Sequence, residues 1–512
     1  MLTKILSAAN QGLDTIPIEV EVSVQKKGFP GFNIIGLPNK SIDEAKERVK
    51  TALENSNIKF PQAKIIVNLA PADIPKEGSN YDLPIAVGIL NTLESAPLPK
   101  EKSFFYGELS LDGSLRHTKG VFLLALAAKK HRVKNLFVPS ASANEAAVIK
   151  GVNVYPVVSI KALINHLNDV EPIKPLKVQR EKQVGSNNTI EFDFAEIIGQ
   201  ESAKRALQIA AAGGHNIFMQ GPPGSGKTML ARALSGILPP LSEDESLEVT
   251  KIYSLTGNIP PGGSLIYTRP FRVSHHTTSR IGLIGGGSNP RPGEISLAHN
   301  GVLFLDEFPE FSRSTLEALR QPIEDHSVTI TRAAGSTEFP AQFMLVAAAN
   351  PCPCGYLGDA KKECKCTPRM IMHYHGKLSG PLMDRIDLHI QVPTVEIEKL
   401  IPSDVTNIKK PDSSKVIRER VEKARIKQQK RFKGLGFYTN AGMKNKHINE
   451  LVTIDKDAMS LLKQAVNSYN LSARTYFWLI KVAQTIADLE DSKSIHSTHV
   501  AEVLQYRVRV ES

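Results

Sequence analysis

Hydrophobic and polar residues follow two different periods along the N-terminal third of the chain. In the run IEVEVSVQ they alternate one by one, which is typical of a strand with one buried face. Further on, apolar residues recur at the three- and four-residue spacing of a helical face: Ile42, Ala45, Val49, Ala52 and Leu53. The apolar runs AKIIVNLAP and LPIAVGILNTL predict another strand and a buried helix. We therefore predict a domain of mixed strands and helices over residues 1–165.

This periodicity stops at about residue 166 and resumes at about residue 191. Between them lies DVEPIKPLKVQREKQVGSNN, whose prolines, charges and Gly-Ser-Asn end predict a linker. After it, SAKRALQIAAAGG predicts a helix that ends at its glycines, and HNIFMQ predicts a strand. The runs GVLFLDE and FMLVAAAN predict two further buried strands, HSVTITRAAGSTEFPAQF a β-hairpin, and SKVIRERVEKARIKQQKRFKG a long helix.

Length and composition limit the class of protein. A chain of 512 residues is too long for one core and indicates two to four domains. The net charge of +11 permits an anionic partner such as nucleic acid without requiring one. The N-terminus lacks the apolar core of a secretory signal, and no run approaches the roughly 20 apolar residues of a membrane span. We expect a cytoplasmic protein with no membrane partner and with reduced cysteines.

A phosphate-binding loop is the strongest chemical signal in the sequence. Between a predicted strand and a predicted helix, the run GPPGSGKT fits the pattern G-x-x-x-x-G-K-[ST]. Its backbone amides are expected to surround phosphate oxygens, its lysine to reach the β- and γ-phosphates, and its threonine to hold Mg²⁺. The alternative is a chance glycine-rich turn. Because no N-K-x-D run follows, we expect ATP rather than GTP. The loop consists of Gly221, Pro222, Pro223, Gly224, Ser225, Gly226, Lys227 and Thr228.

Polar residues end the two apolar strands that follow this loop. Asp306 is expected to position Mg²⁺, and Glu307 to polarise the attacking water as a general base. Asn350 ends the next strand and is expected beside the γ-phosphate and its water. An ordinary acidic strand end is the alternative, which the phosphate loop makes the weaker one.

All four cysteines lie in one short segment: Cys352, Cys354, Cys364 and Cys366. The pattern is C-x-C, nine residues, C-x-C, and four thiolates match a tetrahedral structural Zn²⁺ site. His373 and His375 lie close enough in sequence to replace a cysteine. The alternative is four reduced cysteines without metal. We expect a zinc site here to be structural: it would hold a loop inserted after Asn350, next to the nucleotide, and take no part in the chemistry.

The order of strand, phosphate loop, acidic strand and strand-Asn resembles an AAA+ ATPase. HNGVLFLDEFPEF, LRQPIEDHSVTITR and LSGPLMDRIDLHI resemble the magnesium-chelatase-like branch. Together with GLPNKSIDEAKERVKTAL and KEGSNYDLPIAVGIL, essentially the whole chain resembles the ComM/YifB group of that branch. The resemblance implies a multidomain α/β fold. Its parts are a Lon-protease-like (S5-like) α+β domain at 1–165, a linker at 166–190, an AAA+ core with a parallel sheet at 191–395 and a helical lid at 396–512.

The resemblance also implies roles for two arginines. Arg385 in MDRID matches the arginine finger, which acts on nucleotide held by the neighbouring subunit, so a homo-oligomeric ring, usually a hexamer, is expected. Arg474 matches the second sensor arginine of the helical lid. Surface salt bridges are the alternative for either residue.

The first domain departs from the Lon pattern at its active site. Registering PKEGSNYD on P-K-D-G-P-S-A-G places Asn80 at the serine position, with Ser79 one place early. Phe122 stands where the lysine is expected, although Lys119 is near. We therefore expect a scaffold or nucleic-acid-binding domain and no protease. A shifted Ser79–Lys119 dyad is the alternative.

The resemblance favours a DNA motor that uses ATP for branch migration or helicase activity in recombination or natural transformation. Arg280, Arg291 and Arg332 are candidate contacts to DNA, as is the basic helix with nine basic and two acidic residues from Lys415 to Lys433. Solvated surface charge is the alternative for each. The alternative functions are a chelatase-type subunit that inserts Mg²⁺ into a porphyrin, and a protein-remodelling ATPase.

Overall fold

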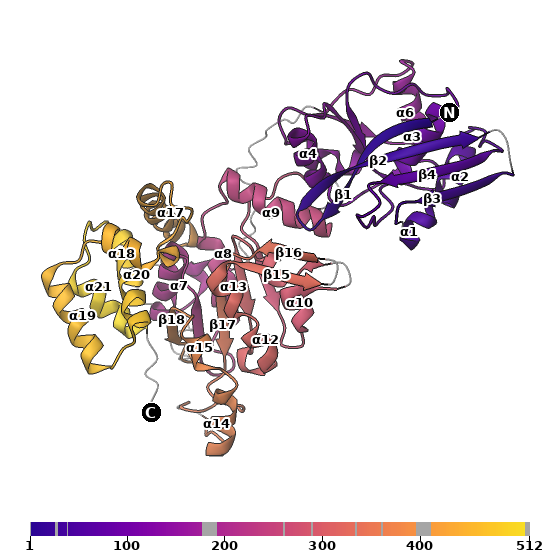
Figure 1. The fold of residues 1–512 in the computed structure, drawn as a ribbon. Coiled ribbons are helices and arrows are strands. Elements are labelled where there is room, and N and C mark those ends of the chain that lie inside the picture. Colours follow the sequence, from indigo (N-terminus) through magenta and orange to yellow (C-terminus); the bar gives the residue numbers. More distant parts are fainter. Residues whose placement is uncertain are drawn as a thin grey trace, which may run out of the picture. The chain divides into compact units, whose positions relative to one another are not determined.

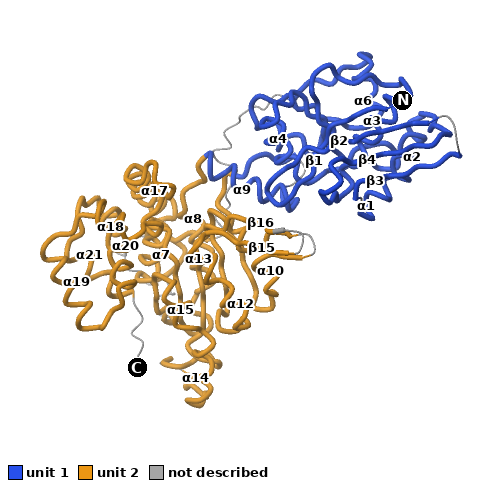
Figure 2. Tube along the Cα trace, viewed as in Figure 1, with its two compact units in different colours: residues 1–184, 243–266 blue, residues 185–242, 267–512 orange. Residues whose placement is uncertain are grey.

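The computed structural model describes residues 2–25, 29–37, 39–176, 192–259, 262–287, 290–332, 335–359, 362–395 and 411–506. The chain forms two compact units (Figure 2). Unit 1 comprises residues 1–184 and 243–266, and unit 2 comprises residues 185–242 and 267–512. From residue 177 to 190 the predicted linker lies outside the described residues, as does the predicted start of the lid at 396. No described helix combines the length and apolarity needed to cross a bilayer.

Unit 1 contains a seven-stranded mixed sheet in the order β3-β4-β2-β1-β5-β8-β9 (Figure 1). The pairs β1–β2 and β2–β4 are antiparallel, and the other neighbours are parallel. The predicted strands at IEVEVSVQ and AKIIVNLAP are confirmed as β2 and β4. The strands are β1 (Leu2–Gln11), β2 (Asp14–Gln25), β3 (Gly31–Ile35), β4 (Lys64–Ala70), β5 (Ser103–Phe105), β8 (Asn135–Pro139) and β9 (Asn153–Val157).

Helices cover both faces of this sheet because successive strand residues point to opposite sides. Ile5 and Ala9 of β1 share a core with α2, α3 and α6, whereas Ala8 belongs to the core with α4 and α5. The predicted helical face is confirmed, because all five of its apolar residues are buried. The helices are α1 (Lys40–Asp43), α2 (Ala45–Asn55), α3 (Asp82–Thr92), α4 (Val121–Lys130), α5 (Ala143–Ala147) and α6 (Ile160–Leu167).

Helix α9 (Glu243–Thr256) belongs to unit 1 although the sequence on both sides of it belongs to unit 2 (Figure 2). Its Ser254 carbonyl accepts a hydrogen bond from the Gly120 amide at 2.9 Å. The Ser254 hydroxyl accepts another from the Phe122 amide at 3.3 Å. These two amides lie at the N-terminus of α4, where backbone donors lack partners within the helix. The expected 191–395 module includes this segment, whereas in the structure it packs into unit 1.

Unit 2 is built on a five-stranded sheet in which every neighbouring pair is parallel. Its order is β11-β14-β17-β10-β18, so strands far apart in sequence are neighbours. The predicted hairpin is confirmed as β15 (Ser327–Arg332) with β16 (Gly335–Pro340). A shorter hairpin joins β12 (Gly285–Gly286) to β13 (Arg291–Pro292). The sheet strands are β10 (Ile217–Gln220), β11 (Phe271–Ser274), β14 (Val302–Leu305), β17 (Met344–Ala349) and β18 (Leu388–Gln391).

One core joins this sheet to the C-terminal helices. Ile217 and Phe304 of the sheet belong to the same buried cluster as Val421 and Ile480. The predicted fold class is confirmed: a multidomain α/β protein with a parallel sheet in its core and a helical C-terminal region. The helices flanking the sheet include α7 (Glu201–Gly213) and α8 (Lys227–Ile237), and the C-terminal helices are α17 (Ser414–Arg431), α18 (Asn445–Leu451), α19 (Lys456–Ser468), α20 (Ala473–Leu489) and α21 (Ser497–Gln505).

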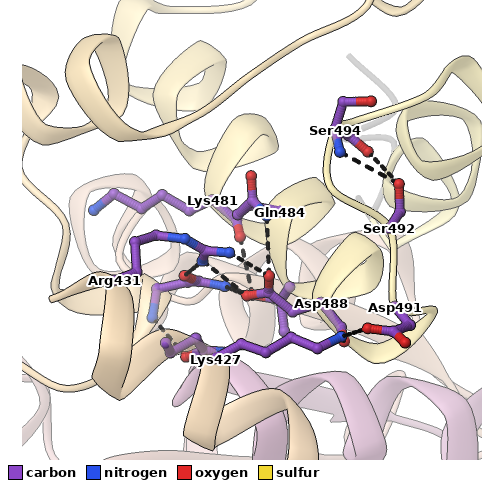
Figure 3. A network of polar contacts seen from close by, with 11 residues as sticks. Lys427, Arg431, Lys481, Gln484, Asp488, Asp491, Ser492 and Ser494 are labelled. Atoms are coloured by element: carbon purple, nitrogen blue, oxygen red, sulfur yellow. Dashed lines mark hydrogen bonds and ion pairs between the residues drawn. The ribbon is translucent and has the colours of Figure 1, made fainter.

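A buried carboxylate, Asp488, organises these C-terminal helices (Figure 3). Arg431 of α17 donates to both of its oxygens, at 2.9 Å to Oδ2. Asn440 donates to the same oxygen at 2.9 Å, and Gln484 donates to Oδ1 at 3.1 Å. Lys427 donates to the Asp488 carbonyl at 2.8 Å. A buried charge is tolerated when it is paired and fully hydrogen-bonded, as it is here.

Two more basic residues of α17 bind the ends of neighbouring helices. Arg418 donates to the Gly236 carbonyl near the end of α8, and Arg425 donates to the Ala211 carbonyl near the end of α7. Such carbonyls have no partner within their own helix. Arg420 also pairs with Asp412 at 2.6 Å, so five of the nine basic residues of the predicted DNA-binding stripe have partners within the fold, which reduces the charge left for phosphates.

Candidate nucleotide-binding site

The phosphate loop joins β10 to α8 at the carboxyl edge of the sheet. The strand and helix that the pattern requires are both present. Gly226 has φ +91°, a left-handed conformation that disfavours side chains, and α8 starts at the next residue. Helix N-terminal amides and the helix dipole at this point favour an anion.

Lys227 and Asn350 are brought together, as the sequence predicts. The Lys227 ammonium donates to the Gly221 carbonyl at 2.7 Å, to the Pro222 carbonyl at 2.9 Å and to Asn350 Oδ1 at 3.2 Å. Burial lowers the pKa of Lys227, and the charge of Asp306 acts in the opposite direction. The ammonium is thus held at the loop by groups that a phosphate oxygen can replace.

The predicted Mg²⁺ ligands also meet. Thr228 Oγ1 lies 2.9 Å from Asp306 Oδ2. Neighbouring oxygens around Mg²⁺ with bonds of 2.0–2.1 Å are about 2.9 Å apart, so this hydroxyl and carboxylate fit the ion. The other Asp306 oxygen accepts a hydrogen bond from the Glu307 amide at 2.9 Å, which fixes the carboxylate.

The Glu307 carboxylate lies against a histidine that the sequence analysis missed. His276 Nδ1 is 2.8 Å from Glu307 Oε2, although the angles are not those of a hydrogen bond. His276 follows β11, and β11 pairs with β14, so the two strands end side by side. Only the strand order places these residues together, and the sequence does not disclose it. His275 is adjacent but instead contacts Thr277 Oγ1 at 3.1 Å.

Arg385 and Arg474 bind the same carboxylate at the amino edge of the sheet, opposite to the phosphate loop. Both place a guanidinium nitrogen near the same Glu324 oxygen, at 2.7 Å and 2.8 Å. These contacts lower the pKa of Glu324, with Arg385 contributing the larger share. The Arg385 carbonyl accepts from Asn216 Nδ2 at 3.1 Å, and Asn216 immediately precedes β10. The four residues of β10 span about 13 Å, and this strand separates the Arg385 backbone from the start of the phosphate loop.

The four cysteines form one cluster in the loop that follows Asn350, next to the phosphate loop. Their sulfur atoms all lie within 4.8 Å of one another, and three of the separations are 3.4, 3.6 and 3.6 Å. A tetrahedron of sulfurs with Zn–S bonds of about 2.3 Å has edges of about 3.8 Å, so the cluster fits Zn²⁺. In the described part of the chain, neither His373 nor His375 joins it; both are exposed on α14 (Pro368–Gly376).

The electrostatics of this cluster favour a cation. The backbone amide of Tyr356, followed by that of Lys365, lowers the pKa of Cys354 to about 6. The pKa of Cys364 is instead raised to about 12: the Cys366 amide lowers it, but burial and the neighbouring thiolates outweigh that amide. Several thiolates this close repel one another unless a positive ion lies between them.

In unit 1 the residues of the possible protease dyad have other partners. Ser79 donates to the Glu108 carboxylate. Lys119 packs its side chain against Gly257, and Phe122 is fully buried in the core. Among the described residues, no contact joins Ser79 to Lys119.

The three candidate DNA contacts lie on neighbouring segments of unit 2. Arg332 ends β15, Arg291 begins β13, and Arg280 begins α10 (Arg280–Ile284). All three side chains are exposed. The two hairpins touch, because Ile330 packs against Gly285.

This fold and site define a phosphate-loop ATPase module with a parallel sheet and a helical lid. Three family models match the chain: magnesium chelatase subunit ChlI over residues 193–400, subunit ChlI of Mg-chelatase over 19–142, and the ChlI C-terminal region over 411–507. The chain is 42% identical over 518 residues to competence protein ComM of Haemophilus influenzae, covering 99% of this chain and 98% of that protein. It is 40% identical over 503 residues to the uncharacterized protein YifB of Salmonella typhimurium, covering 97% of this chain and 95% of that protein.

A more distant match is the magnesium-chelatase subunit ChlI of Olisthodiscus luteus, 26% identical over 225 residues, which covers 41% of this chain and 59% of that protein. The chain belongs to the ComM/YifB group of magnesium-chelatase-like AAA+ proteins. Membership of this AAA+ family implies ATPase activity and suggests ATP and Mg²⁺ as ligands.

Proposed function

We propose that this protein is a ring-forming ATPase that moves on DNA, driving branch migration or unwinding during recombination or natural transformation in the cytoplasm. The observation that carries the proposal is the position of Arg385 and Arg474. Both lie at the sheet edge opposite to the phosphate loop, bound to Glu324. Bound there, the two guanidinium groups are positioned to act on a nucleotide that another copy of the chain supplies. A closed ring, with a hexamer as the expected form, gives every site such a neighbour.

Within each site the residues divide the work. The amides of the phosphate loop and Lys227 bind the phosphates, and Thr228 with Asp306 would hold Mg²⁺, which neutralises phosphate charge. Glu307 takes the proton of the attacking water, and Asn350 orients that water. Arg385 of the neighbouring copy stabilises charge that develops on the γ-phosphate.

DNA as the substrate is supported by the two touching hairpins. Arg280, Arg291 and Arg332 present three exposed guanidinium groups on adjacent segments, which suits contacts to the phosphate backbone. The name of the Haemophilus influenzae relative, a competence protein, points to DNA uptake as the process. Unit 1 then acts as a scaffold or nucleic-acid-binding domain, because Ser79 and Lys119 are engaged elsewhere.

The cysteine cluster is proposed to hold one structural Zn²⁺ per chain. Four sulfurs at nearly tetrahedral separations leave no open position for a substrate, so the ion stabilises the loop and takes no part in hydrolysis.

The test compares ATP hydrolysis by the purified chain with and without forked or four-way DNA. We expect stimulation by DNA, loss of hydrolysis in Glu307→Gln, and loss of the stimulation alone in Arg332→Ala. Lys463→Ala, which removes an exposed lysine of α19 away from the candidate DNA contacts, is the matched control. Equal rates with and without DNA would reject the DNA motor and favour a protein-remodelling or chelatase-type ATPase.

A further inference from the structure

The cysteine loop touches the phosphate loop at Gly355. A β-carbon added to Gly355 would lie 2.6 Å from both Cγ and Cδ of Pro223. No side chain fits at that separation, so the backbone of the cysteine loop rests directly on the pyrrolidine ring in the middle of the phosphate loop. Pro223 directly precedes Gly224 and Ser225, whose backbone amides are among those expected to surround the phosphates.

A second contact ties the same segment to the phosphate loop. Asn350, two residues before the first cysteine, accepts a hydrogen bond from Lys227 at 3.2 Å. Between these contacts, the Gly355 amide donates to the carbonyl of the fully buried Cys352 at 2.9 Å, which closes a tight turn. Cys352 and Cys354 lie in this turn, and the sulfur cluster joins it to Cys364 and Cys366.

We infer that the cysteine loop positions the phosphate loop, with Gly355 as the positioning residue and the sulfur cluster as the brace that keeps it against Pro223. The amides of a phosphate loop bind well only when they are aligned with the phosphate oxygens. In catalysis, a misplacement of about 1 Å can cost a hundredfold in rate. Loss of the brace therefore weakens nucleotide binding. This inference rests on nucleotide binding at the phosphate loop, as proposed above.

Gly355 has a close internal control. Gly358 belongs to the same loop and has a similar left-handed φ, +75° against +85°, but a β-carbon there meets nothing within 4 Å. Gly355→Ala and Gly358→Ala therefore impose the same backbone strain, and only the first displaces Pro223. We expect Gly355→Ala to raise the Kd for a fluorescent ATP analogue at least about tenfold, the scale of one misaligned charge-assisted hydrogen bond. Gly358→Ala should stay within about twofold of the unmodified protein.

Two further variants separate the contact from general damage. Pro223→Ala removes the ring that the new methyl group meets, so Gly355→Ala should raise the Kd much less in the Pro223→Ala variant than in the unmodified chain. Replacing Cys364 and Cys366 by serine should raise the same Kd while lowering the zinc-to-protein ratio. Thermal unfolding of every variant checks that it is folded.

The outcomes are distinguishable. If the unmodified chain does not bind the analogue, the proposed nucleotide site is wrong. If it binds, but Gly355→Ala and Gly358→Ala have the same Kd, the Gly355 contact does not position the phosphate loop. The same follows if Gly355→Ala raises the Kd as much in the Pro223→Ala variant as in the unmodified chain. If the cysteine variant binds as tightly as the unmodified chain, the sulfur cluster is not its brace.

Discussion

The separation between Arg385 and the phosphate loop leads to a prediction about mixed assemblies. Lys227→Ala disables the nucleotide site but leaves the arginine, and Arg385→Ala leaves the site but removes the arginine. Each variant alone should be nearly inactive. For Arg385→Ala we expect the ATPase rate to fall at least about a thousandfold, equal to about 4 kcal/mol of transition-state stabilisation. Because β10 separates the Arg385 backbone from its own phosphate loop by about 13 Å, the proposed role requires that the arginine serve another copy.

Mixing the two inactive variants should therefore restore activity. In rings assembled at random from equal amounts, half the positions carry an intact site, and half of their neighbours carry an intact arginine. Roughly a quarter of the interfaces should then be active, compared with none in either variant alone. The assay is ATP hydrolysis after co-incubation at a salt concentration that permits subunit exchange.

Two controls make the result decisive. Mixing the unmodified chain with the Lys227→Ala/Arg385→Ala double variant should lower the rate from half to about a quarter of the unmodified rate if subunits exchange. Mixing Arg385→Ala with that double variant should give no recovery, because no arginine is present. Proven exchange without recovery in the test mixture would refute action on a neighbouring site, and so would full activity of Arg385→Ala alone.

Four further predictions follow from single contacts. His276→Ala should raise the DNA-free kcat about threefold or more by freeing Glu307, while His275→Ala leaves it unchanged; equal rates in both variants would contradict this role. Arg431→Met should lower the free energy of unfolding by about 3 kcal/mol or more because it strands the buried Asp488, whereas Lys430→Met should have little effect in denaturant titrations. Burial raises the pKa of Glu145 from its usual 4.5 to about 7, so folding favours its protonated form, and the stability of unit 1 should fall as the pH rises from about 4.5 to about 7; Glu145→Gln should remove that dependence from thermal melts. Purified protein should contain about one zinc per chain, lost when Cys352 and Cys354 are replaced by serine, and absence of zinc from the unmodified protein would exclude the metal site.

The sequence predicts the strands and the phosphate loop well because each has a local signal. GVLFLDE and FMLVAAAN are apolar runs that end in polar residues, and they become β14 and β17 with Asp306 and Asn350 at their ends. The contacts between distant segments are different. That His276 meets Glu307, or that Arg385 and Arg474 share Glu324, depends on the strand order, which no local pattern discloses.

The basic helix shows a second limit of sequence reasoning. Its charges suggest a surface for phosphates, yet Arg418 and Arg425 bind carbonyls at helix ends, and Arg431 neutralises Asp488. Unsatisfied backbone carbonyls carry no signature in the sequence, so the structural use of these arginines becomes visible only when the helices pack. Similarly, Val249 and Ile252 of α9 have the same apolar spacing whichever core receives them, and this is why its membership of unit 1 was not predicted.

The path of α9 constrains how this protein can be dissected or evolve. The covalent chain crosses between the two units at 184–185, 242–243 and 266–267, so no single cut yields two intact domains. An ATPase fragment made by deleting residues 1–184 would retain an orphaned helix whose Val249 and Ile252 lose their buried surroundings, inviting aggregation. Gene fusion or domain shuffling that joins foreign sequence at one boundary faces the same obstacle. The two units are expected to be inherited as a pair, and a minimal ATPase needs α9 excised and its flanks rejoined.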